Sequence, residues 1–255
     1  LFRSPVIRSV VYLILATLIT APFGFLVTLA VVLPMRARFW LISVWRAGFM
    51  AICRYVLGLH YRVVGRENIP RSPSIIFSKH QSAWETVGLQ AIFPDQVFVL
   101  KKSLLMIPFL GWAFAAVKMI SIDRSAGKEA LDRVVEQGRE RLKEGLWVVV
   151  FPEGTRVAPG TVKRYKPGGA ILAKRAGVPV VPVAHNAGEF WRRNAFVKRP
   201  GTVTVSCMVL GTWYTLQDDG AGAFGSSGGG ADAGHAGALQ EFTTFHSDSL
   251  SRVLR

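Results

Sequence analysis

Residues 147–156 read WVVVFPEGTR, a short apolar run that passes directly into a polar turn. Consecutive valines between aromatic residues are typical of a strand that is buried on both faces of a sheet. The turn contains Gly154, which allows a tight bend of the backbone, and it ends on Arg156. This stretch therefore predicts a buried strand whose carboxyl end carries polar and cationic side chains.

Similar apolar runs recur on both sides of this stretch. Five of them are short and rich in β-branched residues, and we predict strands at Ser74–Ser78, Val97–Lys101, Met119–Asp123, Trp147–Phe151 and Pro179–Ala184. Helical patterns lie between them at Ala126–Gly145 and Gly168–Ala176. Strands that alternate with helices are typical of an α/β fold. We therefore predict a layered domain with a largely parallel sheet flanked by helices.

The N-terminal part of the chain is apolar over an unusual length. No charged residue occurs from Ser9 to Leu33. A continuous helix of that length would span about 37 Å, more than the roughly 30 Å hydrocarbon core of a bilayer. Pro22 and Gly24 interrupt the middle, which leaves one kinked transmembrane helix or two half-helices in one leaflet. Because arginines flank both ends, we favour the re-entrant arrangement.

A second apolar segment, Phe39–Tyr61, contains Arg46 and Arg54. We predict an interfacial helix with its cations at the lipid headgroups; the alternative is a core helix of the following domain. The expected organisation is membrane-anchoring helices in residues 1–61, an α/β domain in residues 62–210 and a tail in residues 211–255. The tail is low in complexity and rich in Gly and Ala, so we expect it to be flexible.

The composition limits the possible partners. The chain has 255 residues, half of them hydrophobic, and its 31 Lys and Arg against 16 Asp and Glu give a net charge of +15. Such an excess predicts an anionic partner. The sequence contains no recognised nucleic-acid-binding module, no phosphate-binding glycine loop and no His/Cys spacing of a zinc site. We therefore expect an anionic membrane or substrate, and neither nucleic acid nor metal.

His80 and Glu85 form the first candidate constellation, just after the predicted strand Ser74–Ser78. Ligand sites of open α/β sheets lie beyond the carboxyl ends of the strands. A separation of five residues would place the two on different faces of a regular helix, so the pair requires His80 in the loop and Glu85 in the first helical turn. Ser82-x-x-Glu85 is a capping-box pattern, which favours that placement. The pair is either a histidine base with its orienting carboxylate, or a loop histidine beside a helix cap.

Charged residues stand at three further strand ends. The loop Glu153–Arg156 is followed by more basic residues and either binds an anion or is simply solvated; its basicity favours anion binding. Lys101 and Arg124 follow two other predicted strands. Taken alone, each is more typical of a solvated side chain or of a residue beside a helix cap.

Four motifs together resemble those of the glycerophospholipid acyltransferase family. In chain order they are His80-x-x-x-x-Glu85, Ile122-Asp123-Arg124, Phe151–Arg156 and Val178–Pro182. The resemblance covers about residues 10–205. The first motif of the family usually ends in Asp, whereas Glu85 stands here as a tolerated, longer carboxylate. Beyond residue 205 the chain departs from the Gly-Pro loop and final amphipathic helix that are usual in the family.

The resemblance implies acyl transfer from acyl-CoA or acyl-carrier protein to the sn-2 hydroxyl of a lysophospholipid. Lysophosphatidic acid is the expected acceptor and phosphatidic acid the product. His80 would be the general base and Glu85 its orienting partner. The residues that match acceptor- or phosphate-binding positions are Arg156, Glu153, Gly154, Thr155, Lys101 and Arg124. We expect no cofactor besides the donor substrate, and a cell inner membrane location with the catalytic domain on the cytoplasmic face. The alternatives are another lysolipid acceptor or a non-catalytic lipid-binding protein.

Overall fold

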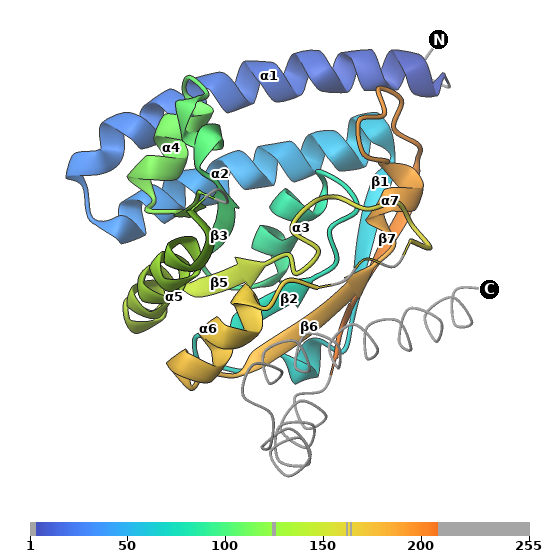
Figure 1. Cartoon of the computed structure of the whole chain (residues 1–255). Coiled ribbons are helices and arrows are strands. Elements are labelled where there is room, and N and C mark those ends of the chain that lie inside the picture. Colours follow the sequence, from blue (N-terminus) through green and yellow to red (C-terminus); the bar gives the residue numbers. More distant parts are fainter. Residues whose placement is uncertain (1–3, 124–125, 162, 164, 209–255) are drawn as a thin grey trace.

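The computed structural model describes residues 4–123, 126–161, 163 and 165–208. Its centre is a seven-stranded sheet with the order β1-β7-β6-β2-β5-β3-β4 (Figure 1). The strands are β1 (Leu59–Val64), β2 (Ile75–Ser78), β3 (Gln96–Lys101), β4 (Ile120–Ile122), β5 (Trp147–Val150), β6 (Val180–His185) and β7 (Gly201–Cys207). All neighbouring strands are parallel except β6 and β7, which are antiparallel.

Helices cover both faces of the sheet. They are α1 (Pro5–Leu29), α2 (Met35–Ile52), α3 (Glu85–Ile92), α4 (Leu110–Ala116), α5 (Gly127–Lys143), α6 (Gly168–Ala176) and α7 (Ala187–Phe190). The short turns are η1 (Ala30–Val32), η2 (Cys53–Leu57), η3 (Arg66–Asn68) and η4 (Lys102–Met106). In Figure 1, α1 and α2 lie side by side on one side of the sheet, and α5 and α6 lie on the other.

Successive residues of the central strands point into two separate cores, which is why these strands are apolar throughout. Ile76 and Val149 pack with residues of α1, α2 and α3 in one core. Ile75 and Val148 pack with residues of α5 and α6 in the other. The prediction of a layered α/β domain with a largely parallel sheet is therefore confirmed.

The local patterns locate the central elements closely. Each of the five predicted strands matches β2, β3, β4, β5 or β6 to within one residue at each end. The predicted helix Gly168–Ala176 coincides with α6, and α5 ends two residues before Gly145, whose φ of +86° is left-handed. The predicted flexible tail lies outside the described residues, as does Arg124.

The N-terminal segment fits the alternative of one helix through Pro22 and not that of two half-helices separated there. The helix α1 runs through Pro22 without ending, and the chain turns between η1 and α2 instead. Proline removes one intrahelical hydrogen bond. It also disfavours the helical conformation of the residue before it and favours an extended one. Pro34 accordingly follows Leu33, which has φ −86° and ψ 160°, and this is where the helices separate.

The segment Phe39–Tyr61 is helical only as far as Leu57. Gly58 adopts a left-handed φ of +67°, and β1 begins at the next residue. The strand was not predicted, and it extends the sheet into the last residues assigned to the anchoring segment. Arg46 Nη1 donates to the Gln90 carbonyl at 2.6 Å, near the end of α3, so this cation joins α2 to the α/β domain.

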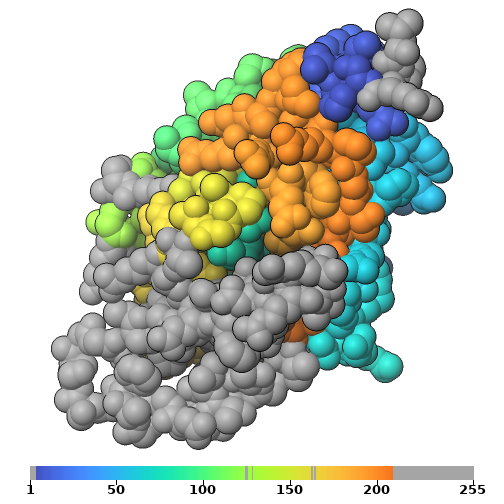
Figure 2. Space-filling view, turned by 90° about the vertical axis from the view of Figure 1, so that its right-hand side faces the viewer, coloured from blue at the N-terminus to red at the C-terminus, as the bar shows by residue number. Residues whose placement is uncertain are grey.

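By length and composition, two helical stretches could each cross a membrane: residues 5–32 and residues 35–57. Both are largely unburied in the protein. In Figure 2 the beginning of α1 (dark blue) lies against the segment before β7 (orange). The Lys198 backbone N–H donates to Ser9 Oγ at 2.9 Å there, so α1 is attached to the domain near both of its ends.

Candidate active site

Five of the predicted site residues, His80, Lys101, Gly154, Thr155 and Arg156, meet at one edge of the sheet. β2, β5 and β3 are parallel neighbours, so the loops after them meet at their carboxyl ends. A cavity of about 910 Å³ covers this edge. His80 follows β2, Arg156 follows β5 and Lys101 ends β3, and all three line the cavity.

His80 and Glu85 form a directly bonded pair. His80 Nδ1 lies 2.8 Å from Glu85 Oε1, and the carboxylate is fully buried. The same oxygen accepts the backbone N–H groups of Gln81 at 2.9 Å and Ser82 at 2.8 Å. One Glu85 oxygen therefore makes both contacts that the sequence left as alternatives, because it binds the imidazole and also holds the backbone of the loop before α3.

The capping box is only half formed. Glu85 reaches back to the Ser82 N–H as the pattern predicts, but Ser82 Oγ accepts from the Trp84 N–H at 3.0 Å. His80 consequently stays in the loop and Glu85 opens the helix. This placement allows the imidazole to face the cavity while its partner remains buried.

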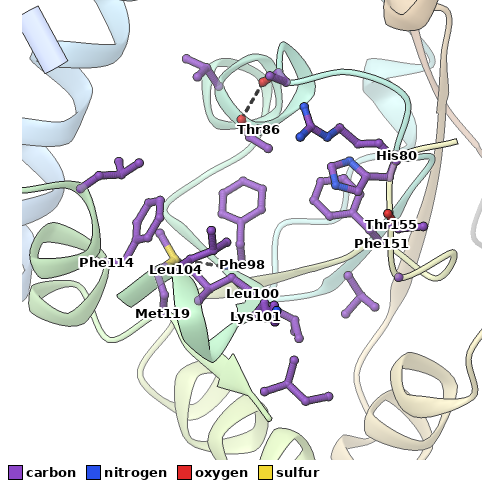
Figure 3. Close-up of a pocket in the computed structure, with 18 of the residues that line it drawn as sticks. His80, Thr86, Phe98, Leu100, Lys101, Leu104, Phe114, Met119, Phe151 and Thr155 are labelled. Atoms are coloured by element: carbon purple, nitrogen blue, oxygen red, sulfur yellow. Dashed lines mark hydrogen bonds between the residues drawn. The ribbon is translucent and has the colours of Figure 1, made fainter. Parts of the chain in front are cut away.

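The ring of His80 is held by stacking as well as by hydrogen bonding. It lies 4.0 Å from the ring of Phe151, centroid to centroid, at an interplanar angle of 14°. Because Nδ1 faces Glu85, Nε2 is the nitrogen left for a substrate proton. Figure 3 shows His80 beside Phe151 and Thr155 at one side of the cavity. The arrangement suits a general base of fixed tautomer.

The backbone of the histidine loop is fixed from two neighbouring strands. The Val157 N–H donates to the His80 carbonyl at 2.8 Å. His185, at the end of β6, lies with Nε2 2.8 Å from the Lys79 carbonyl and accepts the Ala187 N–H through Nδ1 at 3.3 Å. Burial lowers the pKa of His185, which keeps this imidazole neutral as a donor to Lys79. Sequence analysis missed this role because no carboxylate follows His185 at the spacing used to select His80.

Glu153 lies beneath the site rather than in it. Its side chain is fully buried, is not among the cavity-lining residues, and has Oε1 3.5 Å from Lys79 Nζ. Burial raises the pKa of Glu153, against the opposing effect of the Lys79 cation. Its position favours a role in joining the loops after β2 and β5 over direct contact with the acceptor.

The remaining residues of this loop do line the cavity. Gly154 has a left-handed φ of +67°, and a Cβ there would lie 3.1 Å from the Lys166 side chain, so the turn requires glycine. Thr155 and Arg156 follow it into the cavity lining. Arg193, which no sequence pattern singled out, also lines the cavity and donates Nη1 to the Arg156 carbonyl at 3.0 Å.

The cavity is cationic near the histidine and apolar further away. Figure 3 places Leu104, Phe114 and Met119 at the side of the cavity opposite His80. Phe98 lies between this group and His80. Residues of α1 and α2, including Phe23 and Trp45, complete the lining. One cavity can therefore hold both an anionic headgroup and a hydrocarbon chain.

Within the described ranges, no three His, Cys, Asp or Glu side chains gather in a way that could hold a metal ion. The polar groups gathered at this edge are His80, its buried partner Glu85 and nearby cations such as Arg156. This pair at the carboxyl edge of an α/β sheet is the arrangement that the resemblance to acyltransferases implies.

Comparisons with known proteins identify the family. The family model described as Acyltransferase matches residues 60–186. The chain is 45% identical over 201 residues to the 1-acyl-sn-glycerol-3-phosphate acyltransferase of Pseudomonas aeruginosa, covering 78% of each chain. It is 40% identical over 141 residues to the enzyme of the same name from Saccharomyces cerevisiae, covering 53% of this chain and 46% of that one. The chain therefore belongs to the family of the 1-acyl-sn-glycerol-3-phosphate acyltransferases.

A solved structure supports the fold. The crystal structure of the 1-acyl-sn-glycerophosphate acyltransferase from Thermotoga maritima matches with a TM-score of 0.71 at 21% identity. The match covers 96% of this chain and 97% of that chain.

Proposed function

We propose that this enzyme transfers an acyl group from acyl-CoA or acyl-carrier protein to the sn-2 hydroxyl of 1-acyl-glycerol-3-phosphate, which gives phosphatidic acid. The observation that carries the proposal is the His80–Glu85 pair at a cavity whose lining also includes Arg156 and many apolar side chains. The names of the relatives favour this acceptor over another lysolipid.

The reaction needs one base and no protein nucleophile. His80 Nε2 removes the hydroxyl proton while the hydroxyl oxygen attacks the thioester carbonyl carbon. Glu85 stabilises the imidazolium that forms, and general-base assistance contributes about 10²–10⁴-fold. When the tetrahedral intermediate collapses, the carbon–sulfur bond breaks and the imidazolium returns its proton to the departing thiolate. No acyl-enzyme forms in this sequence.

The cations hold the acceptor for this attack. Arg156 is placed to bind the phosphate group through its guanidinium, with Lys101 and Arg193 in the same cavity. Holding the phosphate restricts the position of the sn-2 hydroxyl relative to His80. Such positioning lowers the entropic barrier of the reaction.

The N-terminal helices associate the enzyme with a membrane. On α1 one face is buried against the domain, at Ser9, Tyr12, Ala16, Gly24 and Val27. The opposite face is apolar and exposed, at residues such as Ile14, Leu18, Phe25 and Leu29. A helix with one face on the domain and the other apolar face free suits a position within one leaflet. We place it at the cell inner membrane, with the catalytic domain on the cytoplasmic face.

The test compares wild type with His80→Ala in washed membranes that contain the full chain. Lysophosphatidic acid and radiolabelled acyl-CoA or acyl-carrier protein are supplied, and labelled phosphatidic acid is followed. We expect product from wild type and at least a hundredfold less from His80→Ala. His60→Ala is the matched control, because His60 is an exposed residue of β1. Equal activity of His80→Ala and wild type, or a covalent acyl-protein during turnover, would contradict the proposal.

A further inference from the structure

A second apolar surface lies outside the N-terminal helices. Between β3 and β4 the chain forms η4 and α4, and residues 104–112 expose several large apolar side chains. They are Leu104, Met106, Ile107, Phe109 and Trp112. Met106 is 81% exposed and Trp112 is 45% exposed. An exposed apolar patch of this kind marks an interaction site.

This surface is continuous with the exposed face of α1. The ring of Phe109 lies 6.4 Å from the ring of Phe25 in α1 and 5.3 Å from the ring of Trp112, centroid to centroid. Phe25 is itself 47% exposed, and Leu29 on the same helix is 57% exposed. The three aromatic rings thus connect the apolar side of α1 to residues 104–112.

The backbone conformation at Phe109 keeps residues 104–112 against α1. Phe109 has φ 61° and ψ −56°, a conformation that bulky residues rarely adopt. Its carbonyl packs on α1, where a Cβ at Gly24 would lie only 3.1 Å from the Phe109 oxygen. The close approach at Gly24 holds the Phe109 backbone against the helix, and the residue remains 41% exposed.

The charges beside the patch suit an anionic lipid surface. Lys101 and Lys102 precede it and are both exposed. Lysines next to a bilayer interact with anionic headgroups, and tryptophan is enriched at the membrane interface. Leu104 and Lys101 also line the catalytic cavity, so the patch borders the site.

We propose that residues 104–112 insert into the same leaflet as the exposed face of α1, as a further membrane-contacting element beside the cavity. The partner is an anionic phospholipid bilayer. The inference rests on the proposed function in one respect, because it places the cavity where a lysolipid acceptor can enter from the membrane. Met106 and Trp112 do not line the cavity and serve the membrane contact alone.

Depth-dependent fluorescence tests the insertion directly. Met106→Cys in the full chain is labelled with an environment-sensitive fluorophore; the native Cys53 and Cys207 are both buried. The protein is reconstituted with vesicles of phosphatidylglycerol and phosphatidylcholine. We expect a blue-shifted emission that a shallow spin-labelled lipid quenches and aqueous iodide does not. The control is Arg71→Cys, an exposed residue before β2, at the opposite edge of the sheet from the site.

A label at residue 106 that iodide quenches as it does at residue 71, on protein bound to vesicles, would overturn the inference. A blue shift that appears without vesicles and grows with protein concentration would also overturn it, because a second copy would then cover the patch. Neither result depends on catalysis. Failure of the insertion is thus distinguished from failure of the proposed function, which the His80→Ala comparison tests.

Activity gives a second readout. Met106→Glu, at the most exposed position of the patch, is expected to reduce turnover of lysophosphatidic acid in vesicles at least tenfold. Turnover of a short-chain, water-soluble analogue should stay within twofold of wild type, because the cavity is unchanged. Arg71→Glu introduces the same side chain away from the patch and should leave both rates unchanged. Equal loss on both substrates would contradict a membrane role for this residue.

Discussion

At the scale of single residues, the site depends on one carboxylate oxygen. Glu85 Oε1 binds the His80 imidazole and the N–H groups of Gln81 and Ser82 in the loop before α3. The oxygen thus supports both the base and the loop that carries it. Its loss should affect catalysis and stability by different amounts, depending on what replaces it.

Glu85→Gln retains an oxygen that can accept the backbone N–H groups but removes the negative charge. We expect kcat to fall about 10²–10⁴-fold, because the imidazolium loses its stabilising partner. The free energy of unfolding should change by about 1 kcal/mol or less, whereas Glu85→Ala should lose about 1–2 kcal/mol as a cap. Steady-state kinetics and urea unfolding measure the two effects. Glu136→Gln, on the exposed side of α5, is the control; a kcat for Glu85→Gln equal to that control would contradict the role.

Arg156→Ala should act mainly on acceptor binding. Hydrogen bonds to charged groups are worth about 1.5–3 kcal/mol, which corresponds to an increase of roughly 10–100-fold in the KM for the acceptor. The KM for the acyl donor should change little. Initial rates at varied lysophosphatidic acid concentration test this, with the exposed Arg199→Ala as control. An unchanged acceptor KM in Arg156→Ala would exclude it as the phosphate ligand.

At the scale of elements, three strand ends are joined behind the histidine. The loop after β2 receives a hydrogen bond from the loop after β5 through Val157, and its Lys79 carbonyl faces His185 at the end of β6. Glu153 and Lys79 form a third connection. His80 is therefore positioned by the neighbouring strand ends as well as by Glu85 in its own segment.

This arrangement predicts a pH dependence of stability. Burial lowers the pKa of His185 below its usual 6.5, with Lys79 and His80 adding to the effect and Glu85 opposing it. Below pH 6.5 the unfolded chain binds a proton at this residue more readily than the folded protein does. The free energy of unfolding should consequently decrease as the pH falls from 7.5 to 5.5, by up to about 1.4 kcal/mol per pH unit.

His185→Gln isolates that contribution, because a glutamine amide can donate to the Lys79 carbonyl and does not titrate. We expect urea unfolding of this variant to change less between pH 7.5 and 5.5 than unfolding of wild type. Other groups that titrate in this range are common to both proteins. Identical pH profiles would show that His185 does not remain neutral in the folded protein.

At the scale of the whole molecule, the apolar helices help to enclose the cavity. Residues of α1 and α2 line the cavity. Two arginines of α2 donate hydrogen bonds to the α/β domain. Arg38 Nη1 donates to the Ala116 carbonyl at the end of α4, and Arg46 donates to Gln90, both at 2.6 Å. Cations at the carboxyl ends of helices also interact favourably with the helix dipole.

Arg46→Leu removes the hydrogen bond to the Gln90 carbonyl and keeps an apolar side chain at this position. The Gln90 carbonyl loses its partner, and we expect the free energy of unfolding in detergent to fall by about 1–3 kcal/mol. Arg54→Leu is the control, because the Arg54 guanidinium lies over the ring of Tyr55 in the adjoining turn η2. An equal decrease in the free energy of unfolding in both variants would contradict a stabilising role for the hydrogen bond between Arg46 and Gln90.

Local patterns in the sequence determined the central strands, α5, α6 and the pairing of His80 with Glu85. Strand burial, helical periodicity and helix-cap chemistry depend on residues a few positions apart, and these can be recognised without knowing the fold. β1 was missed because it is the exposed edge strand and its sequence, LHYRVV, lacks a continuous apolar run. The sequence left open whether Pro22 divides the first helix; α1 runs through it, and the next helix, α2, begins after its N-cap Pro34.

The tertiary structure alone decided what surrounds the base. His185 and Lys79 are 106 residues apart, and the contact between Arg193 and Arg156 likewise joins separate segments. Glu153 belongs to a recognisable motif, yet only the packing of two loops shows that its carboxylate is buried beside Lys79. Such contacts follow from the order of strands in the sheet and from the attachment of α1 and α2 above it. That order results from burial summed over the whole chain, which no local pattern contains.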